Sequence, residues 1–305
     1  MNRRTTLALA AGLLGVLAPT SSWAQPTPTP APPTEVFVHQ VSPANSRGDQ
    51  TLIDNRLANN NPSAIVLVTP SYNPNGVLSP NPIGVSFNAS AGRWAIVDES
   101  RTFIPIGASF NVRVSAYPGT ASQARRHRGS PANTVANFTD IDDIALNGKP
   151  NAQVIVTRSY GLFGDPAGVP HPHAVGVWYN FNTAKWSIFN EDGANMPVGI
   201  TFNYIVPVDQ PGPLAPFLHR ALPANTTGII TYLDDPRARL PKALFLATHN
   251  WNPGGVSFGI YNDSPLGLFF DAAPAKVKWS IFNERRAPNI QFGTAFNVLP
   301  LRLTD

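Results

Sequence analysis

The segment KWSIFNE (185–191) decides the fold of this 305-residue chain, because it returns as KWSIFNE (278–284) and in divergent form as RWAIVDE (93–99). In each copy polar and apolar residues alternate, which is the period-two pattern of a β-strand with one face against a core. Each copy also begins with a basic residue and a Trp, and a buried Trp covers about 150–250 Å². We therefore expect the Trp of each copy to anchor the core of a repeated β unit.

Other landmarks recur around these strands in the same order, about 90 residues apart. A His-x-x-x-Pro-Ala-Asn motif starts each copy, and a Thr-x-x-Asp pair, an apolar run ending in Thr, and a Gly follow it. The Trp, a Glu five residues later and a closing Phe-Asn pair complete the copy. The landmarks are His39, His127 and His219; Asp54, Asp142 and Asp234; Thr69, Thr157 and Thr248; Gly84, Gly176 and Gly267; Trp94, Trp186 and Trp279; Glu99, Glu191 and Glu284; and Asn111, Asn203 and Asn297.

The composition changes between the copies, which marks the module boundaries. The segments AYPGTASQA (116–124) and PVDQPGPLAP (207–216) are rich in Pro, Gly and small residues, as linkers are. We therefore place β modules at residues 35–115, 125–206 and 217–303. Each module is long enough to fold alone. We expect three separate modules in tandem, with a closed pseudo-threefold assembly as the alternative.

Short β-branched or alternating runs fill each module. In the second module they are 152–157, 174–180, 185–190 and 200–206, bounded by Asn, Gly, Pro or Asp. None of them has the i, i+3, i+4, i+7 pattern of a helix. With the segment around the His, each module holds five or six strands, and tight turns favour antiparallel pairing. The predicted fold class is all-β, with three homologous antiparallel modules that are each a small sandwich or barrel.

The N-terminus has the pattern of an export signal. Two arginines precede the apolar stretch 7–17, and small residues ending at Ala24 suit a signal peptidase. We expect a signal peptide at residues 1–24 and a secreted or periplasmic protein, and the arginine pair leaves Sec and twin-arginine export both open. Residues 25–34 are Pro-rich and predict an extended linker. Because no later run reaches 18 apolar residues, the sequence predicts no transmembrane segment.

Composition argues against several function classes. The chain has no Cys, which excludes a disulfide framework, a thiolate metal site and a thiol nucleophile. Only 13% of its residues are charged, and its formal net charge is +4. Without the two leader arginines, 20 basic and 18 acidic residues leave +2. That charge is too small for an electrostatic nucleic-acid binder, so we expect no nucleic-acid partner.

The triplicated His, Asp and Glu favour structural roles. A unique active site needs one set of catalytic groups, whereas these residues occur in every copy. We expect each His to bond backbone beside its Pro-Ala-Asn turn and each Asp to cap an Asx-type turn, with a His–Asp metal pair as the alternative. The sequence has no nucleophile-elbow, zinc-protease or nucleotide-binding motif. We therefore predict no catalytic residue, metal ligand or cofactor, and favour a non-enzymatic protein.

Two motifs unique to the second module leave alternatives open. Asp140-Ile141-Asp142-Asp143 has the alternating carboxylates that suit Ca²⁺, but it lacks a full EF-hand loop. His171-Pro172-His173 would suit a metal or a reaction, but no third ligand is evident. Paired carboxylates that hydrolyse a polysaccharide leave no sequence signature, so a secreted polymer hydrolase stays an alternative.

The loops after the Thr strands are the best candidates for a binding site. Each holds an aromatic residue in a polar, Gly-rich setting: SYNPNG (71–76), SYGLFG (159–164) and NWNPGG (250–255). The apolar face of a sugar ring stacks on such a side chain while amides bond its hydroxyls, and a turn with its ring tucked inward is the alternative. The candidate ligand-binding residues are Tyr72, Asn73, Tyr160, Asn250, Trp251, Asn252, Trp178 and Tyr179.

Several motifs together resemble a known family. They are NWNPGG (250–255), VGVWYN (175–180), KWSIFNED (185–192), MPVG (196–199) and FNV (296–298). This set is similar to a domain of unknown function that occurs in tandem in secreted bacterial proteins, and the similarity covers nearly all of residues 35–303. Copy one departs most, with Ser86-Phe87 and Val97-Asp98 in place of the Trp-Tyr and Phe-Asn pairs. The resemblance implies a repeat architecture and export.

These features favour a non-catalytic protein of lectin-like or adhesive type, with a polysaccharide or cell-surface polymer as its partner. Three weak sites on one chain would gain avidity when they engage together. The first alternative is a structural subunit of an extracellular matrix or surface fibre, which would self-associate through exposed sheet edges. The second alternative is the secreted polymer hydrolase.

Overall fold

The computed structural model describes residues 33–118, 123–160, 170–206 and 212–303, without the side chain of Tyr160. The predicted signal peptide, most of the Pro-rich linker and part of the loop 159–164 lie outside the described residues.

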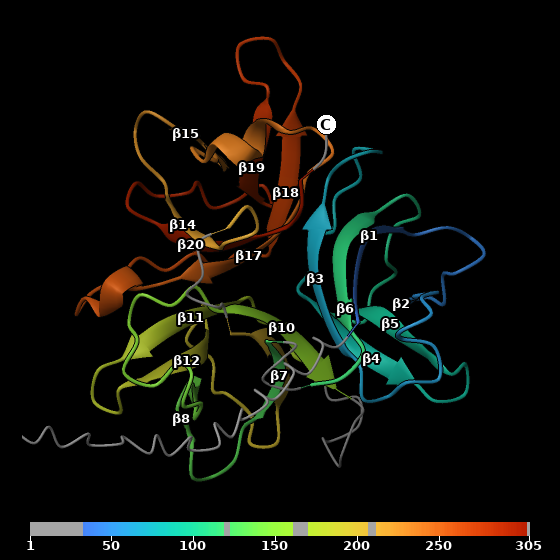
Figure 1. The fold of residues 1–305 in the computed structure, drawn as a ribbon, viewed down its shortest axis with the longest axis horizontal. Coiled ribbons are helices and arrows are strands. Elements are labelled where there is room, and N and C mark those ends of the chain that lie inside the picture. The colour runs from blue at the N-terminus through green and yellow to red at the C-terminus, as the bar shows by residue number, and fades with distance from the viewer. Residues whose placement is uncertain (1–32, 119–122, 161–169, 207–211, 304–305) are drawn as a thin grey trace, which may run out of the picture. The chain divides into compact units, whose positions relative to one another are not determined.

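Strands form each module, as the alternating runs predict (Figure 1). The first module contains β1 (Thr34–Gln40), β2 (Gln50–Leu52), β3 (Ile65–Ser71), β4 (Ile83–Asn88), β5 (Arg93–Asp98) and β6 (Ser109–Ser115). The second contains β7 (Ala124–Arg128), β8 (Thr134–Val135), β9 (Phe138–Ile141), β10 (Ile155–Tyr160), β11 (Val175–Asn180), β12 (Lys185–Asn190) and β13 (Thr201–Ile205). The third contains β14 (Phe217–Arg220), β15 (Thr226–Thr227), β16 (Ile230–Tyr232), β17 (Leu244–Asn250), β18 (Leu266–Asp271), β19 (Lys278–Asn283) and β20 (Ala295–Arg302), with the 3-10 helices η1 (Pro236–Arg239) and η2 (Pro253–Gly255). Among the described residues, no helix is long and apolar enough to cross a membrane.

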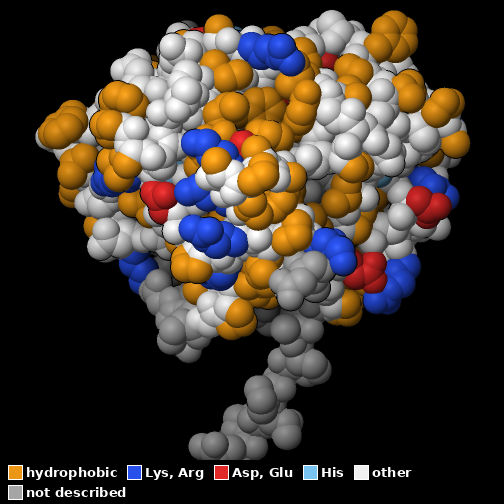
Figure 2. All heavy atoms as spheres, turned by 90° about the horizontal axis from the view of Figure 1, so that it is seen from above, with side chains coloured by type: hydrophobic (Ala, Val, Ile, Leu, Met, Phe, Trp, Pro, Cys, Tyr) orange, Lys and Arg blue, Asp and Glu red, His pale blue; other side chains and the backbone are white. Residues whose placement is uncertain are grey.

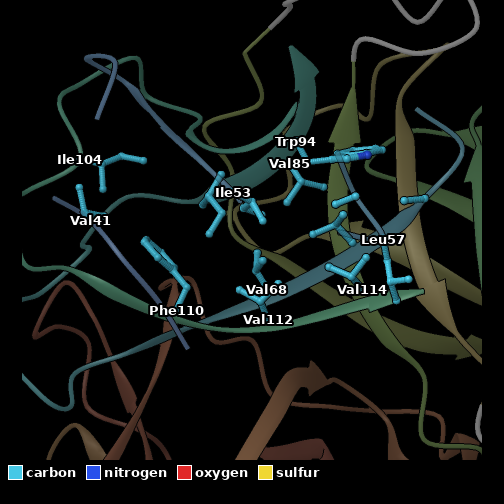
Figure 3. Close-up of a cluster of buried hydrophobic side chains, with 14 of the residues drawn as sticks. Val41, Ile53, Leu57, Val68, Val85, Trp94, Ile104, Phe110, Val112 and Val114 are labelled. Atoms are coloured by element: carbon cyan, nitrogen blue, oxygen red, sulfur yellow. The ribbon is translucent and has the colours of Figure 1, made fainter. Parts of the chain in front are cut away.

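Each module is a small sandwich made of two half-sheets. In the first module, β1, β6 and β3 form one half and β2, β5 and β4 form the other, and all pairs within a half are antiparallel. Figure 3 shows the core between them, where Phe110 and Val112 from β6 face Val85 from β4 and Trp94 from β5. Trp94 is fully buried, and so is Trp186 in the second module, which confirms the repeated Trp as a core anchor.

The modules share their sheets. One sheet has the order β1-β6-β3-β18-β19-β16-β15, the second β2-β5-β4-β10-β13-β7, and the third β14-β20-β17-β11-β12-β9-β8. Half of each module therefore continues a sheet of the next, through the parallel pairs β4–β10, β11–β17 and β18–β3. Three modules joined by three such junctions close on themselves. The expectation of separate modules is wrong, and the closed pseudo-threefold alternative is what the chain forms.

A fourth apolar cluster explains why the modules close. It joins the three inner strands β3, β10 and β17 through side chains that point away from each module's own core. On β3, Val66 and Val68 face the first module's core, whereas Ile65 and Leu67 face the shared cluster. Both faces of β3 are thus buried, which is why its sequence is a continuous apolar run and not an alternating one.

Candidate functional site

The repeated His residues are part of the fold. Each His Nε2 lies 2.8 Å from the hydroxyl of the repeated Thr: His39 with Thr51, His127 with Thr139, and His219 with Thr231. That hydroxyl in turn donates to the Asn of the Pro-Ala-Asn turn. Each His therefore donates to the Thr hydroxyl. The prediction that each His bonds the backbone is wrong. Burial lowers the pKa of all three rings to about 4, so they are neutral at pH 7.

The Thr that ends each apolar run and the Asn of each closing Phe-Asn pair tie each module to the one before it. The Thr157 hydroxyl accepts from the Val68 N–H at 3.1 Å, and the Asn203 amide donates to the Val66 carbonyl at 2.9 Å. The other two junctions repeat these bonds. They run from Val156 N–H to Thr248, from Ala247 N–H to Thr69, from Asn297 to the Val154 carbonyl and from Asn111 to the Phe245 carbonyl.

The repeated Glu reaches in the other direction, to the next module. Its Oε2 accepts a backbone N–H there at 2.9 to 3.0 Å, in the pairs Glu99–His171, Glu191–Asn262 and Glu284–Ser79. The repeated Gly makes room for it, since a Cβ at Gly84, Gly176 or Gly267 would lie 2.1 or 2.2 Å from Oε1 of that Glu. The Glu–Gly pair is therefore a joint between modules, which we call the Glu joint.

The residue opposite each Glu differs, and this breaks the threefold repeat. Arg158 lies opposite Glu99, and His249 lies opposite Glu191 and bonds its Oε1 through Nδ1. At the third joint the corresponding residue is Pro70, because the following residue, Ser71, pairs with Leu268. Burial raises the pKa of Glu99 to about 7, although nearby Arg158 opposes the shift. Burial also raises the pKa of Glu284 to about 7. The three joints thus share one geometry and differ in charge.

A cavity of about 90 Å³ lies where the joints meet, lined by all three modules. We call it the shared cavity. Its polar wall includes Glu99, Arg158, His171 and His249. The His171 Nε2–H donates to Asn190 Oδ1 at 2.8 Å, and His173 Nδ1 lies 2.6 Å from Asp192 Oδ2, so both rings of the His-Pro-His motif have protein partners. Within the described residues, no cluster of three or more His, Asp and Glu could hold a metal ion.

The repeated Asp residues lie on the surface, away from the shared cavity. Asp54 pairs with Arg93, Asp142 with Lys185 and Asp234 with Lys278, which are the basic residues just before each Trp. In the Asp-Ile-Asp-Asp motif the three carboxylates also diverge. Asp140 accepts from Ser187, while Asp143 pairs with Arg125 and accepts from Tyr204.

Two of the predicted aromatic residues come together at the junction between modules two and three. Trp178 from β11 and Trp251, which follows β17, lie edge to face with ring centroids 6.1 Å apart. Phe138 packs on Trp178 at 5.3 Å, and Tyr261 on Trp251 at 5.8 Å. With Asn137 and Phe189 these side chains line a groove of about 150 Å³, which we call the Trp groove.

Tyr72 occupies the equivalent place at the junction between modules three and one. Its ring lies 5.8 Å from Phe269 and 6.0 Å from Phe282, edge to face. These rings correspond to Trp178 and Phe189, because each pair has the same register in its hairpin. The residues around Tyr72 form a groove of about 280 Å³, which we call the Tyr72 groove.

In the part of the chain that the structure describes, the junction between modules one and two lacks the aromatic wall. Ser86 stands where Trp178 and Phe269 stand, opposite Ala95 in the hairpin, and Val97 stands in place of Phe189 and Phe282. Tyr160 pairs with Ser86 along the parallel strands, but its side chain and residues 161–164 lie outside the described part. The loops at Tyr72 and Trp251, which the structure describes, thus lead to two different surfaces.

The other predicted binding residues support the fold. Asn73 and Asn252 extend the parallel junctions, since their Oδ1 atoms accept from the Phe270 and Tyr179 N–H groups at 2.6 and 2.7 Å. Asn250 is buried and bonds Asn297. Tyr179 is buried in the second module's core. The ligand role of these residues stays a prediction.

Sequence reasoning missed Phe138, Phe189 and Tyr261. Phe138 is the first residue of β9, and Tyr261 lies in a loop of the third module. They meet only because β11 pairs with β17. The repetition of KWSIFNE could have drawn attention to Phe189. The residues that Phe189 contacts, however, depend on how the modules join.

Comparison with known proteins agrees with the repeat. The sequence profile of a domain of unknown function, DUF7452, matches residues 28–114, 84–206 and 181–300. No curated protein and no solved structure matches the chain. The three profile matches together span almost all of the three modules, and the chain belongs to the DUF7452 family.

Proposed function

We propose that the protein is an exported, non-catalytic binding protein that takes a carbohydrate in the Trp groove. The observation that carries the proposal is that Trp178 and Trp251, from two different modules, form one concave aromatic surface. Aromatic rings set at an angle offer both a wall and a floor to the apolar face of a pyranose. The loops that the sequence singles out for stacking thus contribute to a groove.

Polar groups at the rim match the hydroxyls of a sugar. Tyr261 is 53% exposed, and its hydroxyl both donates and accepts hydrogen bonds. The Asn137 side chain donates to the Asn190 carbonyl at 3.2 Å, which leaves its Oδ1 for a ligand hydroxyl. A groove with an aromatic base and a few polar groups is typical of a site that binds a small molecule.

The three junctions are unequal, so we propose one principal sugar site in place of three equivalent ones. Of the two grooves described above, the Trp groove combines two indole rings with an amide and an exposed phenol, and the Tyr72 groove does not. Among the described side chains between modules one and two, Ser86 and Val97 stand at the equivalent places and offer no stacking surface. The proposed affinity for a polymer therefore comes mainly from one groove, and the avidity expected from three equal sites is not part of the proposal.

The test is affinity electrophoresis of the mature protein in gels that contain soluble bacterial and plant polysaccharides. Tyr261→Ala and Trp251→Ala should each weaken retardation by a bound polymer at least about tenfold, which is about 1.4 kcal/mol. Phe103→Ala is the control, because Phe103 is 81% exposed and does not line the groove. Unchanged binding by Tyr261→Ala, or no retardation by any polymer, would contradict the proposal.

A further inference from the structure

We propose that the Tyr72 groove binds an amphipathic monoanion, with a hydrocarbon body in the groove and a carboxylate at Arg286. This goes beyond carbohydrate binding and concerns a different junction. The groove holds the same position as the Trp groove, but aliphatic side chains form half of its apolar lining. Its apolar lining consists of Tyr72, Leu78, Ile229, Ile230, Phe269 and Phe282.

The apolar wall is unsuited to a sugar. Ile229 and Ile230 stand where Asn137 and Phe138 stand in the Trp groove, since Thr231 and Thr139 have the same place in the two modules. Leu78 likewise replaces Tyr261, because the next residues, Ser79 and Asn262, make the same bond to a Glu joint. Both polar rim groups of the Trp groove are therefore gone. Sugar hydroxyls buried here would lose water without gaining partners, which is unfavourable.

The volume and shape of the groove suit a hydrocarbon body. It holds about 280 Å³, compared with about 150 Å³ for the Trp groove. The Tyr72 ring stands edge to face against both Phe269 and Phe282, which fixes one wall of the groove. Burial of apolar ligand surface contributes about 25 cal/mol per Å². The groove can therefore hold an alkyl chain or an aromatic ring.

Arg286 gives the groove one positive charge. It is an exposed residue of the lining, and no carboxylate lies among the lining residues. Its neighbour Arg285 is held 3.6 Å from Asp263, whereas among the described residues the Arg286 guanidinium makes no ion pair. A guanidinium binds a carboxylate through two parallel hydrogen bonds. One cation beside an apolar groove favours a monoanion over a neutral hydrocarbon.

The charge of the molecule is compatible with an anionic ligand. Figure 2 shows one face of the molecule, on which hydrophobic side chains gather near the middle, with basic side chains beside them and few acidic ones. A surface with few carboxylates repels an approaching anion little. Fatty acids and small aromatic acids both have the required chemistry, and a medium-chain fatty acid is the simplest probe.

The experiment is isothermal titration calorimetry of the full chain with octanoate, and with octanol as the neutral counterpart. Wild type should bind octanoate more tightly than octanol. Arg286→Gln should weaken octanoate binding at least tenfold and leave octanol binding unchanged. Arg285→Gln is the matched control, because it removes a neighbouring charge that pairs with Asp263, and it should change the octanoate affinity less than twofold.

A second variant tests the apolar wall. Ile229→Asn places in the Tyr72 groove the residue type that stands at position 137 in the Trp groove, so the fold already accommodates it at an equivalent site. It should weaken octanoate and octanol alike by several-fold. Octanoate binding that survives in both Arg286→Gln and Ile229→Asn, or no octanoate binding by wild type, would overturn the proposal. Trp251→Ala should leave octanoate binding intact, which separates this result from the carbohydrate test.

Discussion

The joints between modules and the grooves beside them follow opposite rules. Each Glu joint has the same three parts, a buried carboxylate, a glycine beneath it and a backbone N–H from the next module. The surfaces beside the joints instead differ from one another. One has a pair of Trp rings, the second has aliphatic side chains beside Tyr72, and the third has Ser86 and Val97. The comparison teaches that the repeated residues hold the modules together. Binding specificity is to be sought in the residues that differ between modules.

Acid should have the largest effect, because it acts on the repeated His of all three modules at once. Burial lowers the pKa of His39, His127 and His219 to about 4, so protonation below pH 6.5 favours the unfolded chain. Each ring then costs roughly 3 kcal/mol of stability by pH 4. The free energy of unfolding, measured in urea, should fall as the pH drops from 6.5 to 4.

Two carboxyls oppose this acid effect without cancelling it. Glu99 and Glu284 have pKa values raised to about 7, so their protonation between pH 7 and 4.5 favours the folded chain. His171, whose pKa burial also lowers to about 4, adds to the destabilising side. Stability that is constant or rises from pH 6.5 to 4 would show that the His–Thr pairs are not buried as described.

Filling one Glu joint should have the next largest effect. In Gly176→Ala the new methyl group would meet Glu191 Oε1 at 2.2 Å and the Phe189 ring at 2.7 Å. The carboxylate would have to leave its buried position, at a cost of about 3 kcal/mol or more. Urea unfolding measures this loss. Gly212→Ala is the control, since no atom lies within 4 Å of its Cβ, and equal losses in the two variants would refute the joint.

The charge opposite each Glu should produce a smaller effect, which differs in size between two joints. The raised pKa of Glu284 means that its stability penalty develops as the pH rises from 4.5 to 7. Glu284→Gln should therefore stabilise the protein at pH 8 by about 1–2 kcal/mol and have little effect at pH 5. Glu99→Gln should stabilise it less at pH 8, because the pKa of Glu99 is raised in the same direction but the substitution also leaves buried Arg158 without its counter-charge. An equal or larger gain in Glu99→Gln would contradict the described difference between the joints.

The module and its core could be predicted from the sequence, whereas the closure could not. Period-two alternation predicts β5, β12 and β19, and the Trp in each strand marks its buried face. The run Ile65-Val66-Leu67-Val68 was a signal of a strand buried on both faces, which separate modules do not need. A single module's pattern says nothing about the strand that a neighbouring module will supply.

The grooves depend on that missing information. Tyr72 and Trp251 were identifiable as aromatic residues in loops, but their partners Phe282 and Trp178 belong to other modules. The register of β3 on β18 and of β17 on β11 brings them together. The Glu–Gly pairs were visible as repeats, and only the structure shows that the glycine leaves room for the carboxylate.

Differential scanning calorimetry of the mature chain tests the closed arrangement most directly. Shared sheets and the apolar cluster of Ile65, Ile155 and Leu246 should make the three modules unfold together. We predict one transition whose calorimetric and van't Hoff enthalpies agree, and Gly176→Ala should lower its midpoint without dividing it. Two or three separate transitions, of which only one moves in Gly176→Ala, would contradict the account.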